Sequence, residues 1–391
     1  MSALLIQRRV LRRLTPMKRN LPLGTITNTA SPFEMWTSRE LRFVLQSCAR
    51  ELLPGERVGD CLHMVIPVAQ YVEIRRVTAD KRAFYKNLAV CGSVWQCPVC
   101  AVKISEARRA ELQAALNAWK GGLLMCTYTL SHKSTMSLSK TLETVKLAYR
   151  AGKGGKAYQK FKFQFGIVGS IRALEITFGA NGWHPHVHEL IFTEREVSKE
   201  NQQQMYNYIW SHWSNTVKKE GQWAGVEHGI NLTTADNDIA EYIGKWGHDP
   251  LTPGWGVARE LTKQVSKVGS GKKGETPMQL LYCYFEGDKR KGNLWREYAL
   301  TMKGSNQLVW SKGLRQLALV PQSTSDEEIA ETEPANSILV AQLTRKQWRA
   351  ILVSRMRGEV LSKAESLNHA DFTKWLRELI SFYTVNQVDN S

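Results

Sequence analysis

The spacing of apolar and polar residues along the chain predicts a mixture of helices and short strands. Apolar residues recur every three or four positions in ISEARRAELQAALNAW (residues 104–119), LSKTLETVKLAYRA (138–151) and QQQMYNYIWSHWSNTVKK (202–219), which predicts amphipathic helices. Two further helices are expected near the C-terminus, at TRKQWRAILVSRMR (344–357) and DFTKWLRELISFY (371–383).

Runs rich in β-branched and aromatic residues predict strands at YVEIRRV (71–77), LLMCTYTLSH (123–132) and GVEHGINLT (225–233). The clearest hairpin is IVGSIRALEITFGANGWHPHVHELIF (167–192), in which two such runs flank the turn signal GANG. A helix is expected after the last strand, at ADNDIAEYIGKW (235–246).

Changes in composition divide the chain into four segments. Residues 1–45 are predicted to form a basic arm and linker, and residues 46–120 a cysteine-bearing segment followed by a helix. The main domain is expected over 121–320, and it includes a Gly-, Lys- and Ser-rich loop at 262–277. Residues 321–391 begin with an acidic, polar linker, TSDEEIAETEPAN, and continue into the C-terminal helices.

The charge of the chain indicates a polyanionic partner. Fifty-three Lys and Arg residues against 36 Asp and Glu give a formal charge of +17, and the commonest partner of such a protein is nucleic acid. The opening MSALLIQRRVLRRLTPMKRN lacks acidic residues and the apolar core of a secretion signal. An organellar transit peptide is the alternative interpretation, and we expect a disordered, phosphate-binding arm on a cytoplasmic protein. No uncharged apolar run approaches the ~18 residues that span a bilayer.

Three histidines stand at alternate positions in the second strand of the hairpin: His184, His186 and His188. Alternate residues of a strand point to the same face. If the turn contains an even number of residues, Glu175 of the first strand lies opposite His186 or His188 on that face; an odd number would place it on the other face. Two imidazoles and a carboxylate form a divalent-metal site. Pro185 cannot donate to a ladder, which places this part of the strand at an edge or bulge.

The helix predicted at 235–246 places Asp238, Tyr242 and Lys245 on one face, at positions i, i+4 and i+7. A tyrosine with its ordinary pKa of ~10 needs a neighbouring base or cation to act as a nucleophile. Lys245 offers the cation and Asp238 a proton acceptor. In the alternative interpretation, these three residues are ordinary polar side chains on the solvent-exposed face of a helix.

The cysteines of the N-terminal half predict a structural zinc site. Cys97 and Cys100 form a CxxC turn, and Cys91 supplies a third thiolate. Cys61 is the best candidate for the fourth ligand, with His63 as the alternative. The competing interpretation is a set of reduced core cysteines, as expected for the remaining three.

Several of these stretches together resemble the HUH endonucleases, whose signature is His–bulky apolar–His, here His186-Val187-His188, with a catalytic tyrosine on a downstream helix. More closely, the chain is similar to replication initiators of plasmids and phages that copy by rolling circle. That likeness rests on CGSVWQCPVCAVKISEARRAEL, GWHPHVHELIF, AEYIGKW and LVWSKGLR, in the expected order between about Cys61 and Leu314. The single tyrosine indicates the one-tyrosine subtype.

The resemblance implies an α+β fold, with an antiparallel ferredoxin- or RRM-like sheet, flanking helices and the histidines on a central strand. It makes 121–320 the nuclease domain, 46–120 a zinc-binding segment and the C-terminal residues a helical extension. It also implies Mg²⁺ or Mn²⁺ as the catalytic ion, on His186, His188 and Glu175, and Zn²⁺ as the structural ion. The role of His184 stays open.

The resemblance further implies that Tyr242 cuts single-stranded origin DNA, leaving a 5′-phosphotyrosine and a 3′-OH primer. Lys245 matches the Y-x-x-K pattern of the family. Asp238, or its rival Glu241, activates water at termination. The implied partners are single-stranded and duplex origin DNA, a host helicase and a host polymerase, in the cytoplasm of a bacterium.

Three other interpretations compete with the initiator. A transposase or conjugative relaxase of the HUH group uses the same chemistry on different DNA. A zinc-dependent hydrolase uses the histidines on a small substrate and gives Tyr242 no role. A non-enzymatic zinc-containing DNA-binding protein leaves the histidine hairpin idle. A covalent protein–DNA adduct would distinguish the initiator and the transposase or relaxase from the hydrolase and the non-enzymatic protein.

Overall fold

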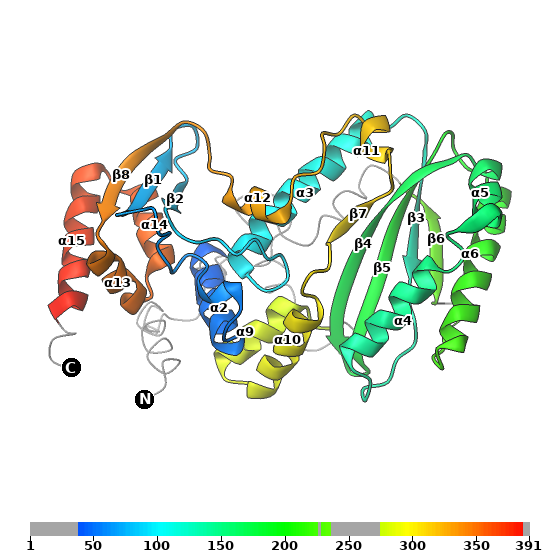
Figure 1. Cartoon of the computed structure of the whole chain (residues 1–391), viewed down its shortest axis with the longest axis horizontal. Coiled ribbons are helices and arrows are strands. Elements are labelled where there is room, and N and C mark those ends of the chain that lie inside the picture. The colour runs from blue at the N-terminus through cyan, green and yellow to red at the C-terminus, as the bar shows by residue number, and fades with distance from the viewer. Residues whose placement is uncertain (1–37, 226–227, 236–273, 386–391) are drawn as a thin grey trace, which may run out of the picture.

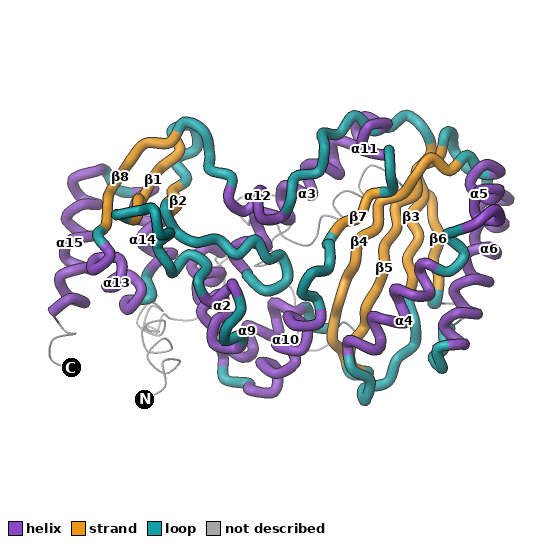
Figure 2. Tube along the Cα trace, viewed as in Figure 1, coloured by secondary structure: helices purple, strands orange, loops and turns teal. Residues whose placement is uncertain are grey.

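A computed structural model describes residues 38–225, 228–235 and 274–385 of the chain. Two antiparallel sheets, each flanked by helices, occupy opposite ends of this structure (Figures 1 and 2). One sheet has five strands in the order β6-β3-β5-β4-β7, and the other has three in the order β2-β1-β8. The predicted α+β class, with antiparallel pairing and flanking helices, is confirmed.

The five-stranded sheet contains the predicted hairpin at its centre. Its strands are β3 (Gly122–Tyr128), β4 (Ile167–Gly179), β5 (Gly182–Thr193), β6 (Ile230–Thr234) and β7 (Leu308–Trp310). The histidine-bearing strand β5 pairs with β3 on one side and β4 on the other, so it is the central strand that was expected.

The turn of the hairpin fixes which side chains share a face. Gly179 pairs with Gly182, which leaves a two-residue loop. Gly182 has φ +90°, a conformation that side chains other than glycine rarely adopt, and a Cβ there would lie 3.0 Å from Cα of Ser134. Because the loop is even-numbered, Glu175 pairs directly with His186.

Alternation along the strands gives the sheet two different faces. Val187 and Ile191 of β5 lie in the core beneath α4 (Leu138–Arg150) and α6 (Lys199–Lys219), and α5 (Gly155–Gln164) packs beside β4. Leu190 and Phe192 point the other way, toward Leu112 of α3 (Pro98–Ala118) and the short helix α11 (Leu314–Leu317). The histidines share this second face with Leu190 because they have the same parity.

The three-stranded sheet joins segments from the two ends of the chain. Strand β1 (Val72–Val77) pairs with β2 (Ala83–Lys86) and with β8 (Ser337–Leu343), so residues of the 46–120 segment and of the C-terminal 321–391 segment form one sheet. A second hydrophobic core fills the space between this sheet and the helices around it, which are α2 (Ser38–Leu52), α13 (Arg345–Ser354), α14 (Arg357–Ser366) and α15 (His369–Val385).

Other elements differ from the sequence prediction or extend it. Helix α2 begins at Ser38, inside the segment predicted as arm, and Leu41 and Leu45 on it are buried. The segment predicted as an acidic linker contains α12 (Asp326–Glu331). The remaining elements are the 3-10 helix η1 (Arg57–Gly59), α9 (Pro277–Glu286) and α10 (Lys289–Thr301). Within the described ranges, no helix has the length and apolar character needed to cross a membrane.

Three predicted features lie mainly outside the described residues: the arm up to residue 37, all but the first residue of the helix at 235–246 and most of the basic loop at 262–277.

Candidate metal centres and their surroundings

Two histidines and a carboxylate converge on one face of the five-stranded sheet. Glu175 stands opposite His186 in the ladder, and its Oε2 lies 2.7 Å from Nε2 of His188. The rings of His186 and His188 are nearly parallel, with centroids 6.0 Å apart. Imidazole nitrogen and carboxylate oxygen together are a donor set for divalent ions. The three residues predicted from the hairpin are therefore brought together.

Threonines of the neighbouring strand orient both rings. The hydroxyl of Thr127 lies 3.1 Å from Nδ1 of His188, and that of Thr129 lies 3.1 Å from Nδ1 of His186. A hydroxyl both donates and accepts, so either tautomer of the ring keeps this hydrogen bond. Such outer contacts leave Nε2 as the ligand atom. Neither threonine was predicted as a site residue, although their alternation in LLMCTYTLSH matches that of the histidines.

The surroundings hold His186 in the form that binds a cation. Burial, followed by repulsion from His188, lowers the pKa of His186 to about 4 in spite of the opposing effect of Glu175. The ring is therefore neutral at pH 7, and neutral imidazole is the form that coordinates metals.

Pro185 lies where β5 extends beyond one of its neighbours. The ladder with β3 runs as far as the pair Tyr128–Val187, whereas the ladder with β4 continues through Ile176–Pro185. This part of the central strand is thus a local edge, as the proline predicted.

His184 has a different partner from the other two histidines. Its Nδ1 lies 2.9 Å from Nδ1 of His132, and its ring centroid is 4.0 Å from that of His186. Burial and repulsion from His186 lower the pKa of His184 to about 3. Because His184 contacts His132, it extends the histidine cluster toward the end of the sheet.

Four residues of the segment that follows β6 were predicted to take part in the attack. Tyr242, Lys245, Asp238 and Glu241 all lie outside the residues that the structure describes. Their roles therefore remain predictions from the sequence.

The four predicted zinc ligands form a second, fully buried centre. The Sγ atoms of Cys61 and Cys91 lie 3.6 and 3.7 Å from that of Cys100, and Cys97 lies 3.7 Å from Cys61. A tetrahedral zinc with Zn–S bonds of about 2.3 Å places its sulfurs about 3.8 Å apart. Among the described residues, this is the group of candidate ligands whose donor atoms all lie within 4.8 Å of one another. The residues fit a structural Zn²⁺.

Cys61, and not His63, completes this group. Its Sγ is part of the group whose ligand atoms all lie within 4.8 Å of one another, whereas burial lowers the pKa of the His63 ring to about 3. Because CxxC turns place their sulfurs at a helix N-terminus, Cys97 also caps α3, accepting a bond from N–H of Cys100.

A buried arginine from the C-terminal helices contacts the surroundings of the cysteines. Arg357, 3% exposed, donates from Nη1 to Oε1 of Gln46 at 2.9 Å, and Nε2 of Gln46 donates to Sγ of Cys97 at 3.2 Å. Four thiolates around Zn²⁺ carry a net negative charge, which a nearby guanidinium offsets. The sequence had no local signal for this link, since Gln46 and Arg357 are 311 positions apart.

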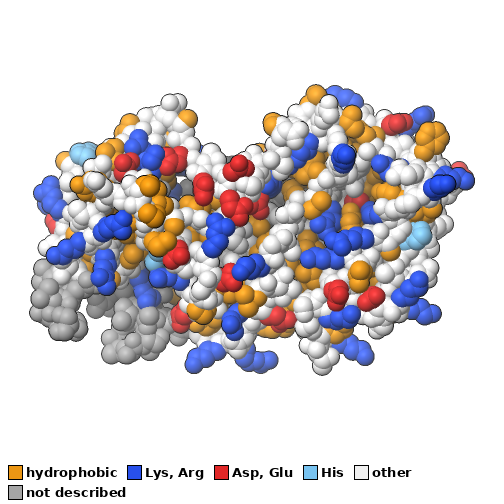
Figure 3. All heavy atoms as spheres, viewed as in Figure 1, with side chains coloured by type: hydrophobic (Ala, Val, Ile, Leu, Met, Phe, Trp, Pro, Cys, Tyr) orange, Lys and Arg blue, Asp and Glu red, His pale blue; other side chains and the backbone are white. Residues whose placement is uncertain are grey.

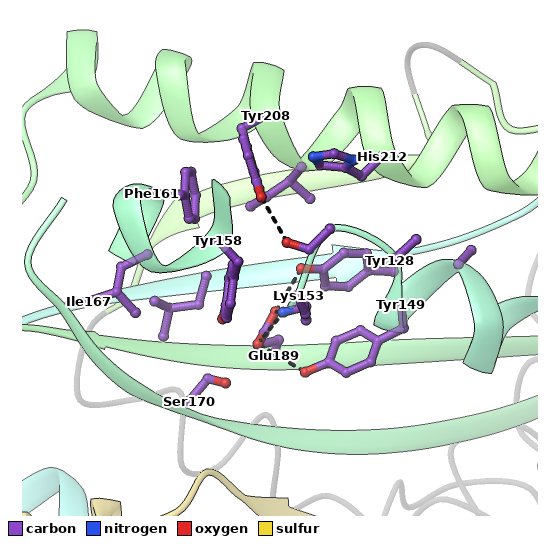
Figure 4. A pocket seen from close by; sticks show the side chains of 15 residues that line it. Tyr128, Tyr149, Lys153, Tyr158, Phe161, Ile167, Ser170, Glu189, Tyr208 and His212 are labelled. Atoms are coloured by element: carbon purple, nitrogen blue, oxygen red, sulfur yellow. Dashed lines mark hydrogen bonds and ion pairs between the residues drawn. The ribbon is translucent and has the colours of Figure 1, made fainter. Parts of the chain in front are cut away.

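Figure 4 shows a buried ion pair between Glu189 and Lys153. Glu189 follows His188 in β5 and therefore points to the opposite face of the sheet. Glu189, 1% exposed, accepts hydrogen bonds from Tyr128 at 2.6 Å, from Tyr149 at 2.9 Å and from Lys153 at 2.6 Å. The adjoining cavity of about 30 Å³ has room for a water molecule or two, which is too little for a ligand. A shift of β5 by one residue relative to its neighbours would turn Glu189 to the other face of the sheet, away from Lys153 and the two tyrosines. The network therefore favours the register in which the histidines share a face with Glu175.

Comparison with known proteins gives two relatives. The chain is 26% identical over 308 aligned residues to a protein named Protein rep from Streptomyces lividans, and the alignment covers 61% of this chain and 66% of that protein. It is 28% identical over 142 residues to a neomycin resistance protein from Streptomyces cyanogenus, covering 29% of this chain and 32% of that protein. The chain thus spans just under two thirds of the first relative. No protein-family model and no solved structure matches it.

Proposed function

We propose that the chain is a plasmid replication protein that nicks single-stranded origin DNA and later rejoins it during rolling-circle replication. The observation that carries the proposal is the convergence of Glu175, His186 and His188 on one face of a central strand. The similarity to Protein rep supports the same class of function, and the charge of +17 suits a nucleic-acid substrate.

The histidine face would hold the divalent ion. Nε2 of His186, Nε2 of His188 and a carboxylate oxygen of Glu175 are the ligand atoms, and Thr127 and Thr129 keep the rings in place. Mg²⁺ or Mn²⁺ bound there supplies Lewis-acid polarisation of a phosphate oxygen. The protein residues orient the phosphate and the nucleophile.

Tyr242 is the proposed nucleophile. Its hydroxyl oxygen forms a bond to phosphorus while the bond from phosphorus to the 3′ oxygen breaks; the tyrosine loses its proton and the 3′ oxygen gains one. The product is a 5′-phosphotyrosine with a free 3′-OH. Attack of a second 3′-OH on the phosphotyrosine reverses the exchange and rejoins DNA, because the phosphodiester energy is kept in the tyrosyl link.

Two side chains near the tyrosine have supporting roles in this proposal. Lys245 stabilises the negative charge that develops on the tyrosine oxygen. Asp238, with Glu241 as the alternative, takes the proton from water when the reaction ends. The zinc centre would be structural, with all four positions filled by cysteine.

A primer-extension assay tests the nicking step. Overlapping single strands that tile the DNA around the gene, each labelled at its 5′ end, are incubated with the protein and Mn²⁺ and then supplied with a complementary template, a polymerase and nucleotides. We expect one tile to yield a shortened labelled fragment that the polymerase extends, because nicking leaves a 3′-OH. Fragments that are cut but cannot be extended would contradict the proposed polarity of attack.

A further inference from the structure

Three cationic side chains lie close enough to repel one another beside α4 and strand β4, which is one strand in from the β7 edge of the five-stranded sheet. Lys146 and Arg150 come from the last two turns of α4, and Arg172 from β4. Arg172 lies over the ring of Tyr149, with its guanidinium carbon 5.6 Å from the centroid. Lys146 donates from Nζ to Oγ of Ser305 at 3.2 Å. Helix α4 and strand β4 thus supply the three cations of one cluster, and the loop before β7 contacts it through Ser305.

The cluster carries positive charge that nearby carboxylates do not offset. Burial lowers the pKa of Lys146, and repulsion from Arg172 and Arg150 lowers it further. Within the described ranges, none of the three forms an ion pair with a carboxylate. Glu189 is close enough to attract Arg172, but its oxygens already accept hydrogen bonds from Lys153 and two tyrosines. Lys146 and Arg172 are half-buried, and partly buried like charges are costly unless an anion joins them.

The cluster adjoins a groove large enough for a polymer. The groove has a volume of about 1190 Å³ and lies between the loop that carries Cys91 and strand β7. Ser305, the partner of Lys146, and Val309, which pairs with Arg172 in the ladder, both line it. Figure 3 shows the hollow between the two halves of the molecule, with Asp and Glu side chains gathered on its α12 side and Lys and Arg side chains on the side of the five-stranded sheet.

The acidic side chains of the groove are already engaged. Three of the four form ion pairs with basic side chains of the same walls, namely Glu56 with Lys303 at 2.8 Å, Glu327 with Arg57 at 3.4 Å and Asp326 with Arg108 at 2.7 Å. The fourth, Glu328, accepts hydrogen bonds from Ser325 at the N-terminus of α12. Next to Ser305 and Val309, the cluster adds positive charge beside the β7 wall of the groove.

We propose that Lys146, Arg150 and Arg172 form a phosphate-binding site that holds the backbone of a nucleic-acid strand lying in this groove. The inference rests on the proposed function for the identity of the polyanion. Arg172 and Glu175 lie on opposite faces of β4, because they are three residues apart. The site therefore holds phosphates other than the one that reacts, and it contributes affinity rather than chemistry.

Salt dependence of binding tests the site without the cleavage reaction. All variants carry Tyr242→Phe, and binding of a fluorescent single strand is measured by anisotropy from low to high salt. Each lost phosphate contact on a single strand changes the slope of log K against log salt by about 0.7, so Lys146→Gln/Arg150→Gln/Arg172→Gln should flatten it by about 2. An unchanged slope in this triple variant overturns the inference.

A matched control separates a site from a general effect of charge. Lys346→Gln/Arg349→Gln/Lys374→Gln removes the same charge from exposed positions of α13 and α15, beside the other sheet. Its slope should stay near that of the parent, and equal flattening in both triple variants would refute the site. The single variant Arg150→Gln changes only an exposed side chain, so the fold is kept. It should flatten the salt slope by about 0.7. An unchanged slope in this variant would count against the inference.

A third measurement distinguishes this inference from the proposed function. With Tyr242 restored, the triple variant of the cluster should cleave at the parent rate when DNA is saturating, while half-saturation needs more DNA. A slower rate at saturating DNA would mean that the cluster takes part in the cleavage reaction, and it would contradict the inference that the cluster contributes only to binding. If the parent itself never cleaves, the proposed function fails, but the salt slopes still decide whether the cluster binds phosphates.

Discussion

Nε2 of His188 lies 2.7 Å from Oε2 of Glu175, although the ladder partner of Glu175 is His186. The carboxylate therefore reaches diagonally across the hairpin, a contact that neighbouring strands allow for long side chains. One residue of β4 is thus within reach of two imidazoles of β5. This relationship is the physical basis for assigning a divalent ion to the histidine face.

The threonines behind the histidines should control metal affinity. Thr127→Val and Thr129→Val each remove a hydroxyl that holds Nδ1 of a histidine at 3.1 Å. Loss of such an outer contact weakens metal binding about 10- to 100-fold. We expect the Mn²⁺ concentration for half-maximal cleavage to rise by that factor, with the maximal rate largely recovered at high Mn²⁺. Thr129→Ser, which keeps the hydroxyl, is the control, and an unchanged Mn²⁺ requirement in both valine variants would refute the assignment.

Zinc content should depend on four of the seven cysteines. The purified, reduced protein should contain about one tightly held zinc per chain. Cys61→Ser or Cys97→Ser should release it and lower the melting temperature. Cys48→Ser and Cys126→Ser are matched controls, because both residues are buried but lie outside the cluster. Elemental analysis that finds zinc retained in Cys61→Ser, but lost in His63→Ala, would identify the other candidate as the ligand.

The ion pair between Glu189 and Lys153 should make stability depend on pH in a defined direction. Burial alone would raise the pKa of Glu189, but Lys153 and the hydrogen bond from Tyr128 lower it below its usual value. A lowered pKa stabilises the fold above the unfolded-state pKa of about 4.3, and this contribution is lost as pH falls through the folded-state pKa.

Chemical unfolding of Glu189→Gln measures this contribution. At pH 7 the variant should be about 3 kcal/mol less stable than the parent, because Lys153 loses the partner of a buried pair. The difference should shrink as pH falls below about 4. Glu220→Gln, in the exposed pair with Lys140, should cost less than about 1 kcal/mol. A difference for Glu189→Gln that stays constant from pH 7 to pH 3 would contradict the assignment.

The histidine hairpin was predictable because its information is local. Alternating residues and a two-residue turn fix both the face and the register, so Glu175 and the histidines could be matched before any tertiary contact was known. The cysteine cluster was predictable for a similar reason, since the chemistry of zinc restricts the ligands and the CxxC turn supplies two of them.

Contacts between distant segments could not be derived in this way. The pairing of β8 with β1 joins residues about 260 positions apart, and SILVAQL carries no local signal for its partner. Glu189 resembles an ordinary polar residue at a strand until Lys153 and two tyrosines surround it. The acidic stretch around residue 326 was predicted as linker because of its composition. Its capping box, Ser325 with Glu328, was the available sign of helix α12.

The most direct test of the central claim is whether DNA becomes covalently attached to Tyr242. The tile that is nicked is labelled at its 3′ end, incubated with protein and Mn²⁺, and resolved on a denaturing protein gel. The label should migrate with the parent protein and with Tyr71→Phe, which alters an exposed tyrosine elsewhere. It should be lost in Tyr242→Phe although that variant still binds the strand, because only the nucleophilic oxygen is missing. A labelled protein band that persists in Tyr242→Phe would contradict the account.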